Sequence, residues 1–158
     1  MRPVLRKAVK SDAVAVAEVL ISSRQAFIPY APSAHGASEV RTWVENMLIP
    51  SGGVTVACSS GAVVGVLATS QANGVSWIDQ LYVLPGFVGK GLGALLLRHG
   101  LVSLARPVRL YSFQANVRAR HFYERHGFCA VAFSDGSMNE ERCPDVLFEL
   151  AAGGGDAA

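Results

Sequence analysis

The strongest signal in this 158-residue chain is the stretch VLPGFVGKGLG, residues 83–93. A β-rich run ends at Val83, a Pro-Gly turn follows, and three alternating glycines lead into a helix-forming segment. Glycines let several backbone N–H groups point into one concavity, and a helix N-terminus adds partial positive charge. Residues 88–93, called the glycine loop below, therefore suit a pyrophosphate group, with Lys90 supplying a full charge. Taken alone, the loop is equally consistent with an ordinary strand-to-helix turn.

Two other nucleotide-binding patterns fit the glycine loop badly. The P-loop needs Ser or Thr directly after its Gly-Lys pair, but Gly91 follows Lys90. The Rossmann pattern Gly-x-Gly-x-x-Gly is absent as well, because Gly89, Gly91 and Gly93 are spaced two by two. The sequence therefore indicates neither of these nucleotide-binding folds.

Hydrophobic patterning on both sides of the loop predicts one mixed α/β domain over residues 1–150, followed by a flexible Ala/Gly-rich tail at 151–158. Turn signals at 59–61 and 73–74 join three strands into an antiparallel meander. The predicted strands are 4–9, 54–58, 62–70, 75–83, 108–113, 128–133 and 145–150, and the predicted helices are 11–27, 38–48, 91–105 and 116–126. Ser11-Asp12 is the expected N-cap of the first helix, Val102 is expected on the apolar side of the third, and Gly127 is the expected C-cap of the fourth. The resulting order is β-α-α-β-β-β-α-β-α-β-β.

Composition narrows the class of protein. The net charge of +2 is too small to indicate nucleic-acid binding, and the hydrophobic fraction of 51% supports a sizeable core. No apolar run approaches the roughly 20 residues that span a bilayer. Three cysteines without a Cys-x-x-Cys pair argue against a disulfide framework. We therefore expect a cytoplasmic protein with no membrane partner.

A second motif, NVRARHFYERHGF, covers residues 116–128. Ala119 is small enough to let a ligand approach its helix closely. Phe122 and Tyr123 are neighbours, so one ring can pack in the core while the other reaches a cleft. Taken alone, Tyr123 is more simply explained as a core or rim aromatic residue.

The two motifs together resemble the GNAT superfamily of N-acetyltransferases. The strand residues 81–83, the glycine loop and the Asn-x-x-Ala-x-x-Phe-Tyr-Glu-x-x-Gly-Phe segment have that family's order and separation. The resemblance covers nearly the whole chain. It implies a GNAT-like acyl-CoA N-acyltransferase fold, with a mixed, mostly antiparallel central sheet flanked by helices. It also implies acetyl-CoA as cosubstrate and a primary amine as acceptor.

The resemblance assigns the cofactor contacts residue by residue. The strand end would lie along the pantetheine arm, and the glycine loop would bind the pyrophosphate. One departure is Val88, where the family has Gln or Arg, so a side-chain contact is missing and Lys90 would compensate for it. The implied cofactor-binding residues are Leu81, Tyr82, Val83, Val88, Gly89, Lys90, Gly91, Leu92, Gly93, Asn116, Ala119, Phe122 and Tyr123.

The chemistry needs a base, because a lysine-like amine with a pKa of about 10.4 is mostly protonated at pH 7. Asp79 is the candidate base, on the strand that ends at Val83, in a context similar to members with an acidic residue there. A water chain could serve instead, with Asp79 binding substrate or facing solvent. The Val83 N–H would hold the oxyanion, and the resemblance implies that Tyr123 protonates the leaving thiolate.

The acceptor would contact the loop holding Tyr30 and His35, and the polar loop 135–141 with Asn139 and Glu140. Taken alone, both loops are more simply explained by ordinary surface polarity. No metal is expected, since His121 and His126 are five residues apart and do not share a helix face. The alternatives to an acetyltransferase are a non-catalytic acyl-CoA sensor and a structural protein with a decayed site. Dimers are common in the family, so a homodimer is considered too.

Overall fold

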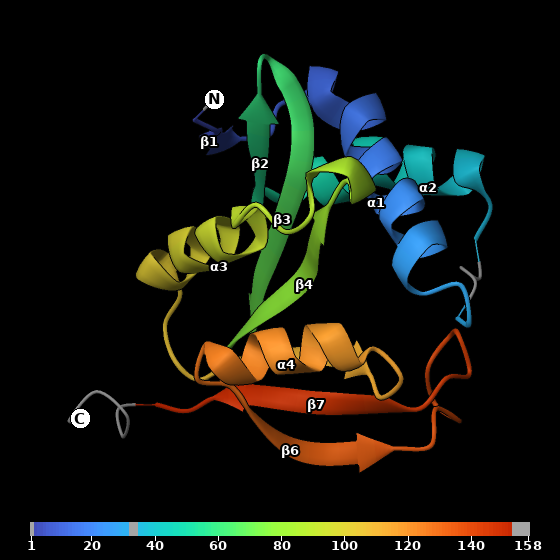
Figure 1. The fold of residues 1–158 in the computed structure, drawn as a ribbon, viewed down its shortest axis with the longest axis vertical. Helices are drawn as coiled ribbons and strands as arrows, with labels where there is room; N and C mark the ends of the chain where they lie inside the picture. Colours follow the sequence, from blue (N-terminus) through green and yellow to red (C-terminus); the bar gives the residue numbers. More distant parts are fainter. Residues whose placement is uncertain (1, 32–34, 153–158) are drawn as a thin grey trace. The chain divides into compact units, whose positions relative to one another are not determined.

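The helices and strands follow one another in the predicted order (Figure 1). The computed structural model describes residues 2–31 and 35–152. The predicted tail therefore lies mostly outside the described residues. The strands are β1 Val4–Lys7, β2 Val54–Ser59, β3 Ala62–Ala72, β4 Val75–Val83, β5 Val108–Phe113, β6 Cys129–Ser134 and β7 Asp145–Leu150. The helices are α1 Ala13–Phe27, α2 Ala37–Trp43, α3 Leu92–Ser103 and α4 Val117–Arg125.

Hydrogen bonding orders the strands β1-β2-β3-β4-β5-β7-β6. Neighbours pair antiparallel at β1–β2, β2–β3, β5–β7 and β6–β7. β4 and β5 pair in parallel, and only at Ser76 with Val108 and Trp77 with Arg109. The mixed, mostly antiparallel sheet predicted from the sequence is confirmed.

The chain divides into two compact units, which are described separately below. The first unit holds residues 1–69 and 80–103, and the second holds residues 70–79 and 104–158. The prediction that residues 1–150 form one domain stays a prediction.

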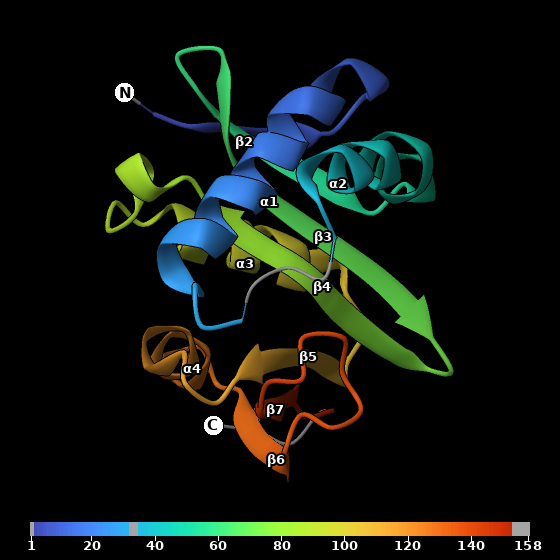
Figure 2. The same cartoon turned by 90° about the vertical axis from the view of Figure 1, so that its right-hand side faces the viewer.

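In the first unit, helices lie on both faces of the strands (Figure 2). Val16 and Val19 of α1 pack against Val56 and Val66 of β2 and β3, and all four side chains have no exposed surface. At about 25 cal/mol per Å² of apolar surface, such burial dominates the stability of the unit. It also fixes α1 against the strands.

Glycine permits close packing of α3 on β3. A Cβ at Gly100 would stand 2.7 Å from Leu67 Cδ2, and one at Gly65 would stand 3.0 Å from Leu96 Cδ1. Leu96 and Leu97 are fully buried. Val102 was expected on the apolar side of this helix. That prediction is wrong, because Val102 is 89% exposed.

In the second unit, α4 lies alongside β7 (Figure 1). Val146 and Phe148 of β7 are fully buried, and Leu110 of β5 is 1% exposed. Alternate residues of both strands are buried, as expected for strands with one covered face. β6 is an edge strand whose every residue is exposed.

The turns have the expected chemistry, whereas one predicted cap is wrong. Asn73 and Gly74 take left-handed φ values of 54° and 78°, as a two-residue hairpin turn requires. Asp12 was expected to cap α1. Its carboxylate instead accepts two hydrogen bonds from Arg6, at 2.7 and 2.9 Å, and one from the Val9 N–H at 2.8 Å. The Asp12 carboxylate therefore accepts hydrogen bonds from three donors outside α1 and does not cap the N–H groups of the helix.

Candidate active site

The end of β4 is where the pantetheine arm was expected. Leu81, Tyr82 and Val83 are half-buried, and Tyr82 packs against the apolar cluster of the first unit. The Leu84 N–H donates to the Val64 carbonyl at 2.8 Å, so β3 still holds the chain just beyond the strand. The strand end is therefore firmly held before the chain turns away.

The glycine loop begins after a 3-10 turn at Pro85–Phe87. Gly89 and Gly91 have φ values of 83° and 82°, in the left-handed region that side chains disfavour. A Cβ added at either glycine would meet no atom within 4 Å. The glycines are thus required by the backbone conformation and not by crowding, and the loop faces open space.

Helix α3 begins at Leu92, so the last two residues of the glycine loop form its first turn. The Leu95 N–H donates to the Gly91 carbonyl at 3.0 Å and begins the helical hydrogen bonds. The N–H groups of Leu92 and Gly93 precede that bond and belong to the first turn, which has no acceptor within the helix. Together with the partial positive charge of the helix end, they provide donors suited to a phosphate group.

Lys90 and Val88 stand at the rim of the loop. The Lys90 ammonium lies 5.4 Å from the centroid of the Phe87 ring, a cation–π distance. Lys90 is exposed and Val88 half-buried, with an extended backbone at Val88. The positive charge that was expected to compensate for Val88 is therefore available at the surface of the loop.

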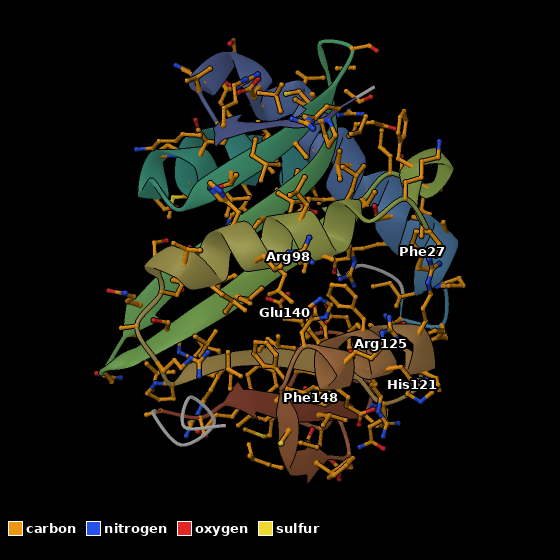
Figure 3. The ribbon with its side chains drawn as sticks, turned by 60° about the vertical axis from the view of Figure 1, so that its left-hand side comes forward. Phe27, Arg98, His121, Arg125, Glu140 and Phe148 are labelled. Atoms are coloured by element: carbon orange, nitrogen blue, oxygen red, sulfur yellow. The ribbon has the colours of Figure 1, made fainter. Side chains whose placement is uncertain are left out.

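Tyr123 lies on α4 in the second unit. It is 9% exposed, and its ring packs edge-on against Phe128 and near Phe148, with centroids 5.8 and 6.1 Å away. Phe122 is the less buried neighbour, while His121 and Arg125 lie on the exposed side of the helix (Figure 3). Most of the Tyr123 ring is thus held by packing, which fixes the direction of its hydroxyl.

Asn116 caps α4. Its side-chain oxygen accepts the Ala119 N–H at 3.2 Å, and the Asn116 carbonyl accepts the Arg120 N–H at 3.0 Å. Gly127, with φ of 92°, ends the helix as predicted. The Asn and Gly of the second motif thus have local structural roles, and Asn116 as a cofactor contact stays a prediction.

Asp79 is exposed as a residue, but its carboxyl group is partly surrounded by protein. Burial of its carboxyl group raises the pKa of Asp79 above its ordinary value of 3.8, and a hydrogen bond from the Ser70 side chain opposes this rise. A raised pKa makes the carboxylate a stronger proton acceptor than a solvated one.

Comparison with known proteins decides the family. The model of the acetyltransferase (GNAT) family matches residues 20–128, more than half of the chain. This chain belongs to the GNAT acetyltransferase family. The matched residues include the glycine loop and Tyr123. No curated protein sequence matches the chain.

Solved structures share the GNAT fold with it. YjaB from Escherichia coli, in its apo form, is 18% identical with a TM-score of 0.75, covering 97% of this chain and 100% of that one. The PaiA N-acetyltransferase of Thermoplasma acidophilum, in complex with coenzyme A, is 19% identical with a TM-score of 0.72, covering 94% and 98%. Arabidopsis thaliana Naa50, in complex with the bisubstrate analogue CoA-Ac-MVNAL, is 19% identical with a TM-score of 0.69, covering 94% and 98%.

The polar loop of this GNAT chain, expected to contact the acceptor, is tied together internally. The Asn139 amide donates to the Cys143 carbonyl at 2.7 Å and to Asp145 at 3.1 Å, and its oxygen accepts the Cys143 N–H at 3.1 Å. Gly136 is also required there, since its φ is 85° and a Cβ would stand 2.4 Å from the Cys143 carbonyl carbon. Asn139 therefore shapes the loop, while Glu140 is exposed on it.

The other expected acceptor residues, Tyr30 and His35, follow α1 in the first unit. Tyr30 is 43% exposed. His35 pairs with Glu39 at 3.5 Å and lines a cavity of about 440 Å³ between α1 and α2, to which Tyr30 does not contribute. The structure thus places the two residues in different surroundings, although both follow the same helix.

Two searches of the described residues were negative. Residues 2–31 and 35–152 contain no group of three or more His, Cys, Asp or Glu side chains arranged to hold a metal ion. Within the same ranges, every helix is too short or too polar to cross a membrane.

Ser23 is a residue at the site that the sequence analysis missed. Its hydroxyl donates to the Val83 carbonyl at 3.0 Å, and its side chain has no exposed surface. A signal existed in the sequence, because Ser23 falls on the apolar face of α1 at helical spacing from Val16 and Val19. A buried polar side chain at such a position needs a hydrogen-bond partner.

Proposed function

We propose that this protein transfers the acetyl group of acetyl-CoA to a primary amine of a small molecule or peptide, by direct attack in a ternary complex. The observation that carries the proposal is the glycine loop, exposed and left-handed at Gly89 and Gly91, opening onto the first turn of α3. Membership of an acetyltransferase family supports acyl transfer as the reaction. Two proteins of the same fold, PaiA and Naa50, form complexes with coenzyme A and with a coenzyme A bisubstrate analogue.

In the proposed reaction, Asp79 takes a proton from the acceptor ammonium, directly or through water. The freed nitrogen lone pair attacks the thioester carbonyl and forms the C–N bond. The Val83 N–H stabilises the negative charge that develops on the carbonyl oxygen. When the C–S bond breaks, Tyr123 gives its proton to the thiolate of coenzyme A. The nitrogen loses its second proton, which restores the Tyr123 hydroxyl directly or through water and leaves a neutral amide.

Charge supports a cationic acceptor. Asp79 is an acid, and Glu140 is exposed on the loop 135–141 beside Glu141. An acceptor carrying a positive charge in addition to its reacting amine would be attracted to such carboxylates. Polyamines, aminoglycosides, amino acids and peptide N-termini are the classes to test.

The experiment is acetyl-CoA turnover across these four classes, with release of free thiol as readout. Cys129 is exposed and free, and it would itself react with a thiol reagent. Cys129→Ser protein and an enzyme-only blank therefore serve as controls. Turnover with at least one amine supports the proposal.

Two negative results have different meanings. Tight binding of coenzyme A without turnover of any amine would instead support an acyl-CoA sensor. Val88, which stands where the family has Gln or Arg, is the sequence feature that favours this alternative. Failure to bind coenzyme A at all, measured by calorimetry, would contradict both functions.

A further inference from the structure

The Ser23 hydroxyl forms a hydrogen bond outside its own helix. A serine inside a helix commonly bonds the carbonyl four residues earlier. The Ser23 hydroxyl instead donates to Val83, 60 positions away, at 3.0 Å. With no exposed surface, its hydroxyl has lost its hydration and depends on this bond.

The Val83 carbonyl, which accepts the hydrogen bond from Ser23, is one half of the Val83–Leu84 peptide group. The Val83 carbonyl and the Leu84 N–H belong to the same planar unit. Ser23 holds the carbonyl, and the Val64 carbonyl of β3 accepts the N–H at 2.8 Å. The Val83–Leu84 peptide plane is thus held from both ends, by a helix on one side and a strand on the other.

This plane stands at the junction between two parts of the proposed cofactor site. Residues 81–83 lie before it, and the 3-10 turn Pro85–Phe87 and the glycine loop follow it. Helix α1 also contacts that 3-10 turn. A rotation of the plane would change the direction in which the chain leaves β4, and with it the position of the loop relative to the strand end.

We infer that Ser23 is a positioning residue of the cofactor site, whose hydroxyl sets the spacing between the end of β4 and the glycine loop. The inference rests on the proposed function, because that spacing matters only to a ligand that contacts both parts. Coenzyme A is such a ligand, with pantetheine at the strand and pyrophosphate at the loop. Adenosine 3′-phosphate 5′-diphosphate has the phosphates but no pantetheine, so it would contact the loop alone.

The test compares these two ligands in the Ser23→Ala protein by calorimetry. We expect the Kd for coenzyme A to rise about three- to tenfold, the range of one net hydrogen bond. The Kd for adenosine 3′-phosphate 5′-diphosphate should change less than about twofold. Ser23→Cys, nearly the same shape with a weaker donor, should give the same pattern with a smaller amplitude, and it serves if the alanine protein folds poorly.

Two control variants separate positioning from general stability. Ser22→Ala makes the same chemical change one residue away, where the hydroxyl donates to Glu18 at 2.7 Å on the exposed side of α1. Val16→Ala shortens a fully buried side chain of the same helix, so it should lower the melting temperature while it leaves the Ser23–Val83 hydrogen bond in place. Both should bind coenzyme A like the unaltered protein.

Three results would overturn the inference. An unchanged Kd for coenzyme A in both Ser23 variants removes the role, and an equal loss for the two ligands shows a general weakening of the loop. A loss in Val16→Ala equal to that in Ser23→Ala attributes the effect to stability. Coenzyme A binding by the unaltered protein is measured before any variant is compared. If the unaltered protein does not bind, the proposed function is contradicted and the inference fails with it.

Discussion

Gly89 and Gly91 have nearly the same left-handed backbone, with φ values of 83° and 82°, on either side of Lys90. Such alternation turns successive N–H groups toward one side of the chain. Neither glycine is crowded, since an added Cβ would meet no atom within 4 Å. The conformation itself therefore explains the residue type at both positions.

Gly91→Ala should weaken coenzyme A binding at least about tenfold, measured by calorimetry. Alanine resists left-handed φ by about 1–2 kcal/mol, so the loop would relax and its N–H groups would change direction. Gly86→Ala is the matched control, because Gly86 lies in the same segment, also faces open space, and has no left-handed φ. Equal affinity of the Gly91→Ala and unaltered proteins would show that the loop conformation is not needed for binding.

Tyr123→Phe should lower kcat about a hundredfold or more and leave the Kd for coenzyme A nearly unchanged. The substitution removes only the hydroxyl, and the ring contacts with Phe128 and Phe148 are retained. Steady-state kinetics with the best amine from the panel measures kcat. Tyr111→Phe, on an exposed tyrosine of β5, is the control and should keep full turnover. An unaffected kcat in Tyr123→Phe would remove the acid role.

The pH dependence of kcat/KM tests Asp79. A base must be deprotonated, so activity should fall as the pH drops through the pKa of Asp79, which burial raises above 3.8. Ser70→Ala removes the hydrogen bond that opposes this rise, and the acid limb should move to higher pH. Asp79→Asn should lower kcat/KM and abolish that limb. A limb that stays in place in both variants would assign it to another group.

The pair Arg6–Asp12 should stabilise the fold in a pH-dependent way. Hydrogen bonds from Arg6 and burial act oppositely, and the net effect lowers the pKa of Asp12 below 3.8. The stabilisation is therefore fully present above pH 3.8 and is lost as the pH falls through the lower folded value. Asp12→Asn should cost about 2 kcal/mol near pH 7, and the difference should shrink in strong acid.

Urea unfolding at several pH values measures this difference. Glu18→Gln makes the same chemical change on an exposed helix position, and we expect less than about 0.5 kcal/mol there. A constant difference between Asp12→Asn and the unaltered protein from neutral pH to strong acid would contradict the ionic explanation.

Much of the fold was predictable, because local signals agreed with the final packing. The pair Asn73-Gly74 requires a tight turn, and Gly127 ends α4 where its left-handed φ was expected. The glycine loop was recognised from its spacing together with the second motif, residues 116–128. Each of these features depends on the backbone preferences of one or two residues, and those preferences follow directly from the residue types.

The hydrogen-bond partners of individual polar side chains were not predictable, whether they lie near in the sequence or far away. The carboxylate of Asp12 binds Arg6 and not its helix, and the hydroxyl of Ser23 finds a carbonyl 60 residues away. Asn139 similarly has its amide occupied by Cys143 and Asp145. Periodicity identifies which face of a helix is buried, but the partner of a buried polar group follows only from the tertiary structure.

The most direct test of the central claim is a titration with coenzyme A followed by the backbone amide signals of the labelled protein. If the glycine loop holds the pyrophosphate, the largest shifts on binding will occur at Gly89, Lys90, Gly91 and Gly93, and pyrophosphate alone will shift the same amides. Saturable binding of coenzyme A that leaves these four signals in place would contradict it.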